Sequence, residues 1–235
     1  MSVEFDKHAA RYDGGLDNPS KRALGSSPDQ FIAVKARWLL RREPALKRGD
    51  LSVLDYGCGA GDLMRVLAKL GARAAFTGCD VSKGMLDEAA RRWPSAFDPP
   101  PVLVAHQGAE TTFSPGQFDV ATVSAVLHHI PPAERPHVYA ELARVLKPGG
   151  RLYVFEHNPR NPLVRYVVAR TPIDANAILL DADEVRRGLL ASARYELETE
   201  YLMFTPPGLP ILGAIDRALT WLPLGGQYVV AARKQ

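Results

Sequence analysis

The chain has 235 residues, of which 46% are hydrophobic and 23% charged, and its formal net charge is +3. It is long enough to bury one α/β core, and its scattered basic residues do not indicate nucleic-acid binding. No uncharged apolar stretch of about 18 residues and no leader pattern is present, so we expect no transmembrane helix, no secretory signal and a cytoplasmic protein. Cys58 and Cys79 lack the spacing of a zinc or disulfide framework, and no metal site is predicted.

The first predicted element is a helix that begins near Pro28. Residues 27–30 read Ser-Pro-Asp-Gln, which is typical of a helix start, and Phe31, Val34 and Trp38 then recur at helical spacing. We interpret this helix as scaffold that covers a sheet.

Residues 53–63 predict a strand, a glycine turn and a helix start in immediate succession. The apolar strand ends in Asp55, and three glycines at alternate positions allow a sharp turn close to a ligand. These are Gly57, Gly59 and Gly61. The helix that follows points its N-terminus at whatever lies over the glycines.

The glycine spacing distinguishes between cofactors. A dinucleotide fingerprint needs G-x-G-x-x-G, and the third glycine position of that pattern is Asp62 here, so a pyrophosphate would meet a carboxylate. Asp55 is likewise misplaced for a polyphosphate and suits a cationic amino group.

A second acidic strand end follows at Asp80, 23 residues after Gly57. A βαβ unit places a carboxylate at this point to accept hydrogen bonds from ribose hydroxyls. Ser82 is the expected N-cap of the next helix, which carries Met85.

The remaining pattern predicts an α/β fold, with a Rossmann-like doubly wound sheet of seven strands, mostly parallel, that ends in an antiparallel hairpin. Further strands are expected at 102–107, 118–123 and 151–156, and a hairpin from 195–204 with 228–233. Helices are expected at 131–147 and from about Asp181, the second of which carries Val185, Leu189 and Leu190.

Two long connections, 158–181 and 205–227, are the expected acceptor-side insertions, because long loops in compact domains are usually functional. Arg160, Arg165 and Arg170 lie in the first and are candidates to bind a carboxylate or phosphate on the acceptor, although we expect at least two of them on the solvated surface. In the second, Pro210 can open a short helix with one apolar face. That face is expected to meet the acceptor pocket, a dimer partner, a membrane surface or the parent domain.

Over residues 50–157 the sequence resembles the class I S-adenosylmethionine-dependent methyltransferases. The resemblance rests on the glycine turn, Asp80, Phe-Asp-Val-Ala at 118–121 and Leu-Lys-Pro-Gly-Gly at 146–150. It implies a single methyltransferase domain over 1–235, with a helical lid and cap at 1–48, a cofactor-binding core at 49–157 and the two insertions. An acid that many relatives carry after the third strand is replaced by Gly108, so the adenine contacts are less defined.

The resemblance implies S-adenosylmethionine as cofactor, with Asp80 on the ribose, Val81 and Met85 beside the adenine, and Tyr12 in the lid. The full set of expected cofactor residues is Tyr12, Asp55, Gly57, Cys58, Gly59, Gly61, Asp80, Val81, Met85, Gln107, Gly108, Ala109 and Ser124.

Three histidines are candidates for a general base, because histidine titrates near neutrality and His128, His129 and His157 follow the fourth and fifth strands. At most one is expected to have this role, and each could instead be a histidine that merely lines the pocket. Glu156 precedes His157, although neighbours on a strand point to opposite faces.

The predicted function is methyl transfer to an oxygen or nitrogen atom of a small molecule of natural-product, quinone or saccharide type. The missing Asn-Pro-Pro-aromatic motif and the modest charge disfavour an RNA or protein methyltransferase. Two further hypotheses are a non-catalytic cofactor-binding protein and an NAD-dependent oxidoreductase, and the glycine spacing opposes the oxidoreductase. A homodimer is possible.

Overall fold

The computed structural model describes residues 6, 28–205 and 213–235. Its centre is a seven-stranded sheet in the order β3-β2-β1-β4-β5-β7-β6. β7 runs antiparallel to both of its neighbours, and the other pairs are parallel. This confirms the predicted fold class. The strands are β1 Ser52–Tyr56, β2 Ala75–Asp80, β3 Val102–Ala105, β4 Phe118–Ser124, β5 Leu146–His157, β6 Tyr195–Leu202 and β7 Gln227–Lys234.

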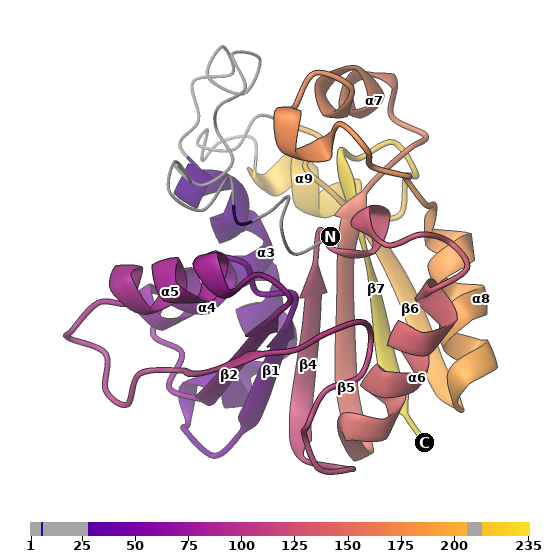
Figure 1. Cartoon of the computed structure of the whole chain (residues 1–235). Coiled ribbons are helices and arrows are strands. Elements are labelled where there is room, and N and C mark those ends of the chain that lie inside the picture. The colour runs from indigo at the N-terminus through magenta and orange to yellow at the C-terminus, as the bar shows by residue number, and fades with distance from the viewer. Residues whose placement is uncertain (1–5, 7–27, 206–212) are drawn as a thin grey trace.

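Helices cover both faces of the sheet (Figure 1). One group is α3 Pro28–Arg42, α4 Asp62–Lys69 and α5 Lys83–Arg92, and the other is α6 Arg135–Val145 and α8 Ala182–Ser192. The short helices α7 Pro162–Val168 and α9 Gly213–Ala218 lie beyond the carboxyl ends of the parallel strands. Three 3₁₀ turns complete the described elements, η1 Pro44–Lys47, η2 Leu127–His129 and η3 Pro172–Asp174.

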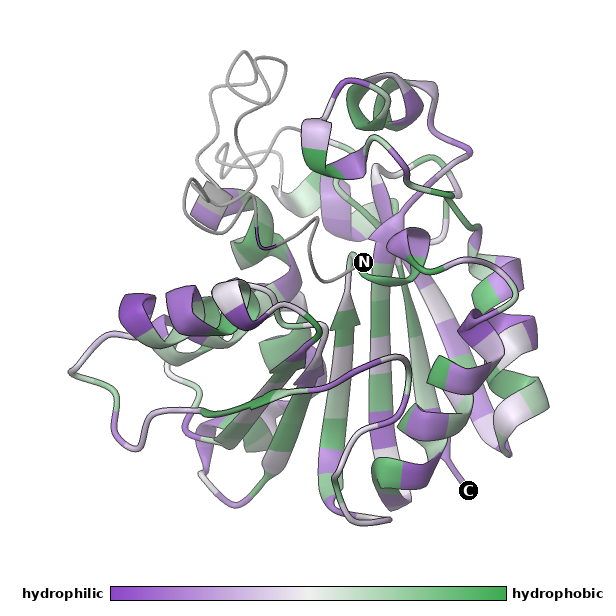
Figure 2. Ribbon diagram, viewed as in Figure 1, coloured by the Kyte–Doolittle hydropathy of each residue, from purple (hydrophilic) through white to green (hydrophobic). Residues whose placement is uncertain are grey.

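The period-two alternation of the strands explains the two layers of core. In β1, Leu54 and Tyr56 pack with α6 and α8, whereas Val53 packs with α3 and α4. Trp38 of α3 meets Tyr153 and Phe155 of β5 edge to face, with ring centroids 5.5 and 5.6 Å apart. Figure 2 accordingly shows apolar strands between amphipathic helices.

Two predicted details are corrected. The helix expected from residue 131 begins at Arg135, because 131–134 form a turn in which Glu134 N–H donates to the Pro131 carbonyl. β5 begins at Leu146, earlier than expected, because Leu146 already pairs with Phe118 of β4. The register then shifts, and regular pairing continues from Val120 with Arg151. Leu190 is 54% exposed, since it lies about 100° round the helix from the buried Leu189.

The predicted helix start at Pro210 lies outside the described residues, and α9 begins at Gly213. Among the described helices, none combines the length and the apolar character needed to cross a bilayer.

Candidate functional site

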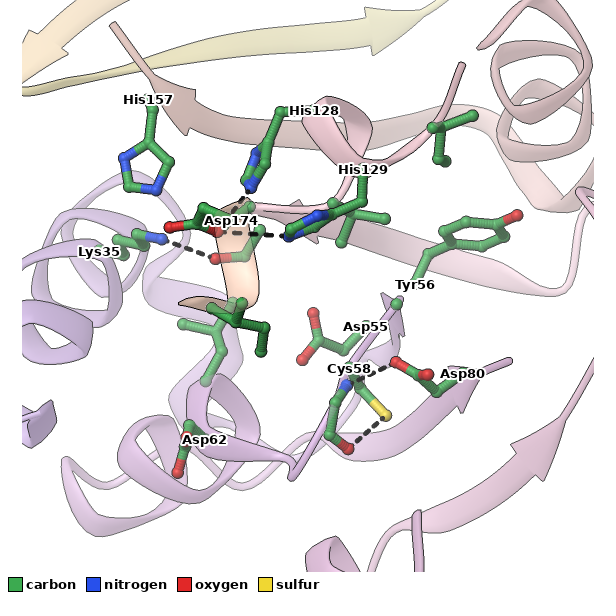
Figure 3. A pocket seen from close by; sticks show the side chains of 18 of the residues that line it. Lys35, Asp55, Tyr56, Cys58, Asp62, Asp80, His128, His129, His157 and Asp174 are labelled. Carbon is green, nitrogen blue, oxygen red and sulfur yellow. Dashed lines mark hydrogen bonds and ion pairs between the residues drawn. The ribbon is translucent and has the colours of Figure 1, made fainter. Parts of the chain in front are cut away.

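A cavity of about 1250 Å³ opens at the carboxyl ends of the parallel strands (Figure 3). It lies where β1 and β4 are neighbours and the strand order reverses, which is where open α/β sheets bind ligands. The cavity has a cofactor side, built by the loops after β1, β2 and β3, and an acceptor side, built by the loops after β4 and β5 together with α7 and α3.

The glycine loop after β1 packs closely against Val126 and the end of β2. Gly57 has φ 70°, and a Cβ at this position would lie 2.6 Å from Cγ2 of Val126. The backbone N–H groups of Gly57 and Cys58 donate to the Cys79 carbonyl at 2.8 and 2.9 Å. Only glycine fits at position 57, because a side chain would clash and would also disfavour the positive φ.

Asp80 anchors this loop to the end of β2. Its Oδ2 accepts a hydrogen bond from Gly59 N–H at 2.8 Å, and its Oδ1 accepts one from Ser82 N–H at 2.9 Å. Burial raises the pKa of Asp80, and the bonds from Ser82 and Gly59 oppose that shift. Ser82 caps α5 as predicted, since its Oγ accepts from Met85 N–H at 3.1 Å.

Most of the expected cofactor residues line this cavity. They are Asp55, Gly57, Cys58, Gly59, Asp80, Val81, Met85, Gln107, Gly108, Ala109 and Ser124. Gly61 does not line it; with φ 70° it starts α4, and its α-carbon faces Ala89 of α5. Tyr12 lies outside the described residues.

Asp55 is a buried carboxylate, 2% exposed, at the floor of the cavity. Thr122 Oγ1 donates to its Oδ1 at 2.7 Å. Burial raises the pKa of Asp55 to about 7, against the opposing effects of the Thr122 bond and the positive charge of Lys35. An ionised Asp55 therefore lacks full compensation in the protein alone.

Lys35 is a pocket residue that the sequence did not reveal. It comes from α3, and its Nζ donates to Ser124 Oγ at 2.9 Å (Figure 3). Phe31 and Ile32 of the same helix also line the cavity. The interpretation of α3 as scaffold alone was therefore incomplete.

The acceptor side contains a cluster of histidines and carboxylates. Glu156, fully buried at the end of β5, accepts the Leu127 and Val126 amides at 2.7 and 3.0 Å, and its Oε2 lies 2.6 Å from His128 Nδ1. The Glu156 carboxylate thus pairs with His128 of η2, as expected if Glu156 and its strand neighbour His157 point to opposite faces of β5.

Asp174 closes this cluster from the 158–181 insertion. Its Oδ1 lies 3.5 Å from His128 Nε2 and 3.6 Å from His129 Nε2. His157 is close by, with its ring centroid 5.2 Å from that of His128. The long connection indicated a functional segment, but nothing in the sequence singled out Asp174.

The three histidines have different electrostatic surroundings. Burial lowers the pKa of His128, but Glu156 and Asp174 outweigh it and raise that pKa to about 9. Burial, followed by the positive charge of His128, lowers the pKa of His157 to about 3. Near neutral pH His128 is an imidazolium and His157 is a neutral imidazole. The side chain of His129 is 17% exposed and lines the cavity.

The rest of the acceptor side is mostly apolar, with polar groups from Lys35, Asn161, Thr205 and Gln227. Its apolar residues are Phe31, Ile32, Ile130, Leu163, Val164, Val167, Ile173, Met203 and Phe204. Arg160, Arg165 and Arg170 do not line the cavity. Arg160 pairs with Asp181 and Asp183, and Arg170 stacks on Tyr166 at 3.7 Å from the ring centroid.

Comparison with known proteins agrees with this geometry. The family described as "Methyltransferase domain" matches residues 53–150. The chain is 31% identical over 203 residues to the ubiquinone/menaquinone biosynthesis C-methyltransferase of Desulfotalea psychrophila, an alignment that covers 83% of this chain and 75% of that protein. It is 38% identical over 128 residues to the 2-phytyl-1,4-naphtoquinone methyltransferase of Synechococcus elongatus, covering 52% of each. The chain thus spans about half the length of the first curated relatives it matches.

Solved structures share the fold. A SAM dependent methyltransferase from Archaeoglobus fulgidus aligns with a TM-score of 0.62 at 18% identity, covering 86% of this chain and 93% of that one. Magnesium protoporphyrin IX methyltransferase from Synechocystis, solved with bound SAM, aligns with a TM-score of 0.60 at 19% identity, covering 88% and 79%.

The raised pKa of Asp55 has a consequence for stability. Between its ordinary pKa of 3.8 and about 7 the folded chain holds a proton that the unfolded chain has released. The free energy of unfolding therefore falls as pH rises through this window, and Asp55→Asn removes the loss. We expect this variant to be more stable than the parent by roughly 1–3 kcal/mol at pH 8 and equal to it near pH 4, as measured by urea unfolding. Asp87→Asn, an exposed carboxylate on α5, is the control, and an Asp55→Asn protein less stable than the parent at pH 8 would contradict the argument.

Proposed function

The chain belongs to the class I S-adenosylmethionine-dependent methyltransferases, and from this premise we propose that it transfers a methyl group from S-adenosylmethionine to a small-molecule acceptor of quinone type. The observation that carries the proposal is one cavity that joins the glycine loop and Asp80 to the histidine–carboxylate cluster and its apolar surroundings.

The cofactor side fits S-adenosylmethionine on two structural grounds. Gly59 lines the cavity and has open space where a Cβ would lie, so a ligand can approach its backbone closely. Asp55 is a buried carboxylate that a cationic amino group would compensate. We assign Asp55 to the ammonium, Asp80 to the ribose hydroxyls, and Val81 and Met85 to the faces of the adenine. When bound, the cofactor supplies a methyl group activated by the positive sulfonium.

The acceptor side supports a molecule with an apolar body and a hydroxylated end. Its apolar lining comes mainly from α3, from α7 and from Met203 and Phe204, and the histidine–carboxylate cluster supplies its ionisable groups together with Lys35. The relatives named above act, by their names, on quinones. Both insertions contribute lining residues, Asp174 from 158–181 and Thr205 from 205–227, which supports their acceptor-side role.

Which acceptor atom is methylated depends on which group of the acceptor loses a proton. Loss of a proton from a ring hydroxyl makes that oxygen and the neighbouring ring carbon nucleophilic. The sequence favoured oxygen or nitrogen, whereas the relative from Desulfotalea psychrophila is named a C-methyltransferase. We therefore place a ring carbon first, and product analysis by NMR separates C-methyl from O-methyl and N-methyl products.

Of the three histidines, His129 suits the removal of this proton best. His128 is already protonated between two carboxylates, and the low pKa of His157 makes it a weak base. His129 faces the cavity, and Asp174 lies beside its Nε2. We assign His129 to the proton transfer, with His128 and His157 as positioning residues.

An exposed apolar surface next to the cavity supports contact with a membrane that carries a lipid-linked acceptor. It consists of Leu163 and Tyr166 of α7, 58% and 52% exposed, with Trp221 and Leu224, 72% and 53% exposed. Asn161 Nδ2 donates to the Leu224 carbonyl at 2.8 Å, so the two segments lie side by side. Arg170, which stacks on Tyr166, borders it with a positive charge. A cytoplasmic location stays a prediction.

Cofactor binding is the first test. Isothermal titration is expected to show binding of S-adenosylmethionine and S-adenosylhomocysteine and none of NADH. Asp80→Asn should weaken both affinities by roughly 10- to 100-fold, because hydrogen bonds to a charged acceptor are lost. The Asp87→Asn control should bind normally. NADH binding, or an unchanged affinity in Asp80→Asn, would overturn the cofactor assignment.

Turnover tests His129. With a reduced, demethylated naphthoquinol as acceptor, His129→Ala is expected to lower kcat by about 10²- to 10⁴-fold while the affinity for S-adenosylmethionine stays within twofold. His137→Ala, on the exposed face of α6, is the matched control. Equal loss of cofactor affinity and turnover would make His129 structural.

Vesicle sedimentation tests the membrane contact. The parent chain is expected to sediment with anionic lipid vesicles, and a Trp221→Ser, Leu224→Ser variant should remain in the supernatant. Leu190→Ser, equally exposed on α8, should sediment like the parent. If the double variant instead converts a dimer to a monomer in analytical ultracentrifugation, the surface is a dimer contact.

A further inference from the structure

We propose that His128, His129 and Asp174 form a binding site for a divalent transition-metal cation at the acceptor end of the cavity. Two imidazoles and one carboxylate are the donor set that zinc and iron(II) sites use when they keep positions open for a substrate. The sequence predicted no metal site, because these positions do not have the regular spacing of a metal motif and meet only through the fold.

The ligand atoms are close enough to share one cation. Asp174 Oδ1 lies 3.5 and 3.6 Å from the Nε2 atoms of His128 and His129, and the three donor atoms lie within 4.8 Å of one another. Bond lengths near 2.0–2.1 Å in a tetrahedral site put ligand atoms about 3.3 Å apart. The two distances to Asp174 are close to this value.

A second, independent observation concerns His128 Nε2. The residue is 1% exposed, and within the described chain this nitrogen makes no hydrogen bond; its 3.5 Å ion pair with Asp174 is too long for one. A buried nitrogen without a bond is costly and needs an explanation. A cation between His128 and Asp174 would satisfy it.

The opposite side of the same ring supports the same conclusion. His128 Nδ1 lies 2.6 Å from Glu156 Oε2, and Glu156 is itself held by two backbone amides. Metal-ligating histidines almost always donate their second ring N–H to such a carboxylate, which fixes the tautomer and turns the other nitrogen to the metal. Glu156 is thus a positioning residue for this ligand.

The local charges balance a divalent cation. Glu156 and Asp174 provide two negative charges, and bound His128 and His129 would be neutral imidazoles. Lys35, a positively charged residue that also lines the cavity, directs its Nζ to Ser124.

The use of the cation rests on the proposed function. A hydroxyl of the acceptor would take the open position, where the metal lowers its pKa and the proton leaves to solvent. The resulting anion then attacks the methyl carbon through its ring carbon, so that a carbon–carbon bond forms while the carbon–sulfur bond breaks and its electron pair stays on sulfur. The methylated ring carbon finally loses its own proton to solvent. In that state the metal takes over the proton removal assigned above to His129.

Cobalt(II) binding to the full-length, EDTA-treated chain tests the site without any assay of activity. We expect one Co²⁺ per chain, visible d–d absorption, and displacement of Co²⁺ by Zn²⁺. His129→Ala and Asp174→Asn should each weaken the affinity for Co²⁺ by at least about 100-fold, and Glu156→Gln by about 10- to 100-fold. His137→Ala should not change it. Circular dichroism confirms the fold of each variant, and His129→Gln replaces any His129→Ala protein that does not fold.

The outcomes separate the two proposals. Absence of Co²⁺ binding in a chain that binds S-adenosylmethionine would overturn the metal site and leave the proposed function standing. Co²⁺ binding that His129→Ala and Asp174→Asn do not weaken would also overturn it. Co²⁺ binding at these residues in a chain that transfers no methyl group, with or without metal, would support the site and overturn the proposed function.

Discussion

The architecture of the cavity depends on the buried carboxylate of Glu156. It ends β5, accepts the amides of Val126 and Leu127, and contacts the ring of His128. These bonds hold the turn after β4, in which Ala125 has the uncommon φ of 59°. The side chain of Val126 in turn faces the α-carbon of Gly57. One carboxylate therefore fixes the acceptor cluster and also supports the glycine loop on the cofactor side.

The buried charges on the two sides of the cavity are compensated to different extents. On the acceptor side His128 lies between Glu156 and Asp174, so these buried charges compensate one another. On the cofactor side Asp55 has one hydroxyl donor and a more distant lysine, and its carboxylate is disfavoured by burial. Such a site lowers the stability of the protein without ligand, and it favours a ligand with a positive charge beside Asp55.

The sequence predicted the cofactor side well because its signals are local. A strand, three glycines and Asp80 occur within about 30 residues, and each constrains the backbone directly. The acceptor side was predicted only as segments. His128 and Glu156 are 28 residues apart, Asp174 comes from an irregular insertion, and Lys35 reaches the cavity from a helix whose pattern indicated packing alone. Such contacts form only in the folded chain, and the periodicity of the sequence does not predict them.

The two insertions are joined to each other through polar bonds. Asn158 Nδ2 donates to the carbonyls of Gly225 and Pro223, at 2.8 and 3.1 Å, and Asn161 extends this link to Leu224. Each asparagine uses a side chain from one insertion to satisfy backbone groups of the other, so neither segment keeps its shape when the other is exchanged. In chimeras designed to change the substrate preference, the two insertions should therefore be exchanged together. Exchange of one insertion alone would leave backbone carbonyls without their donors. Exchange of both would transfer the whole acceptor side of the cavity and leave the cofactor side unchanged.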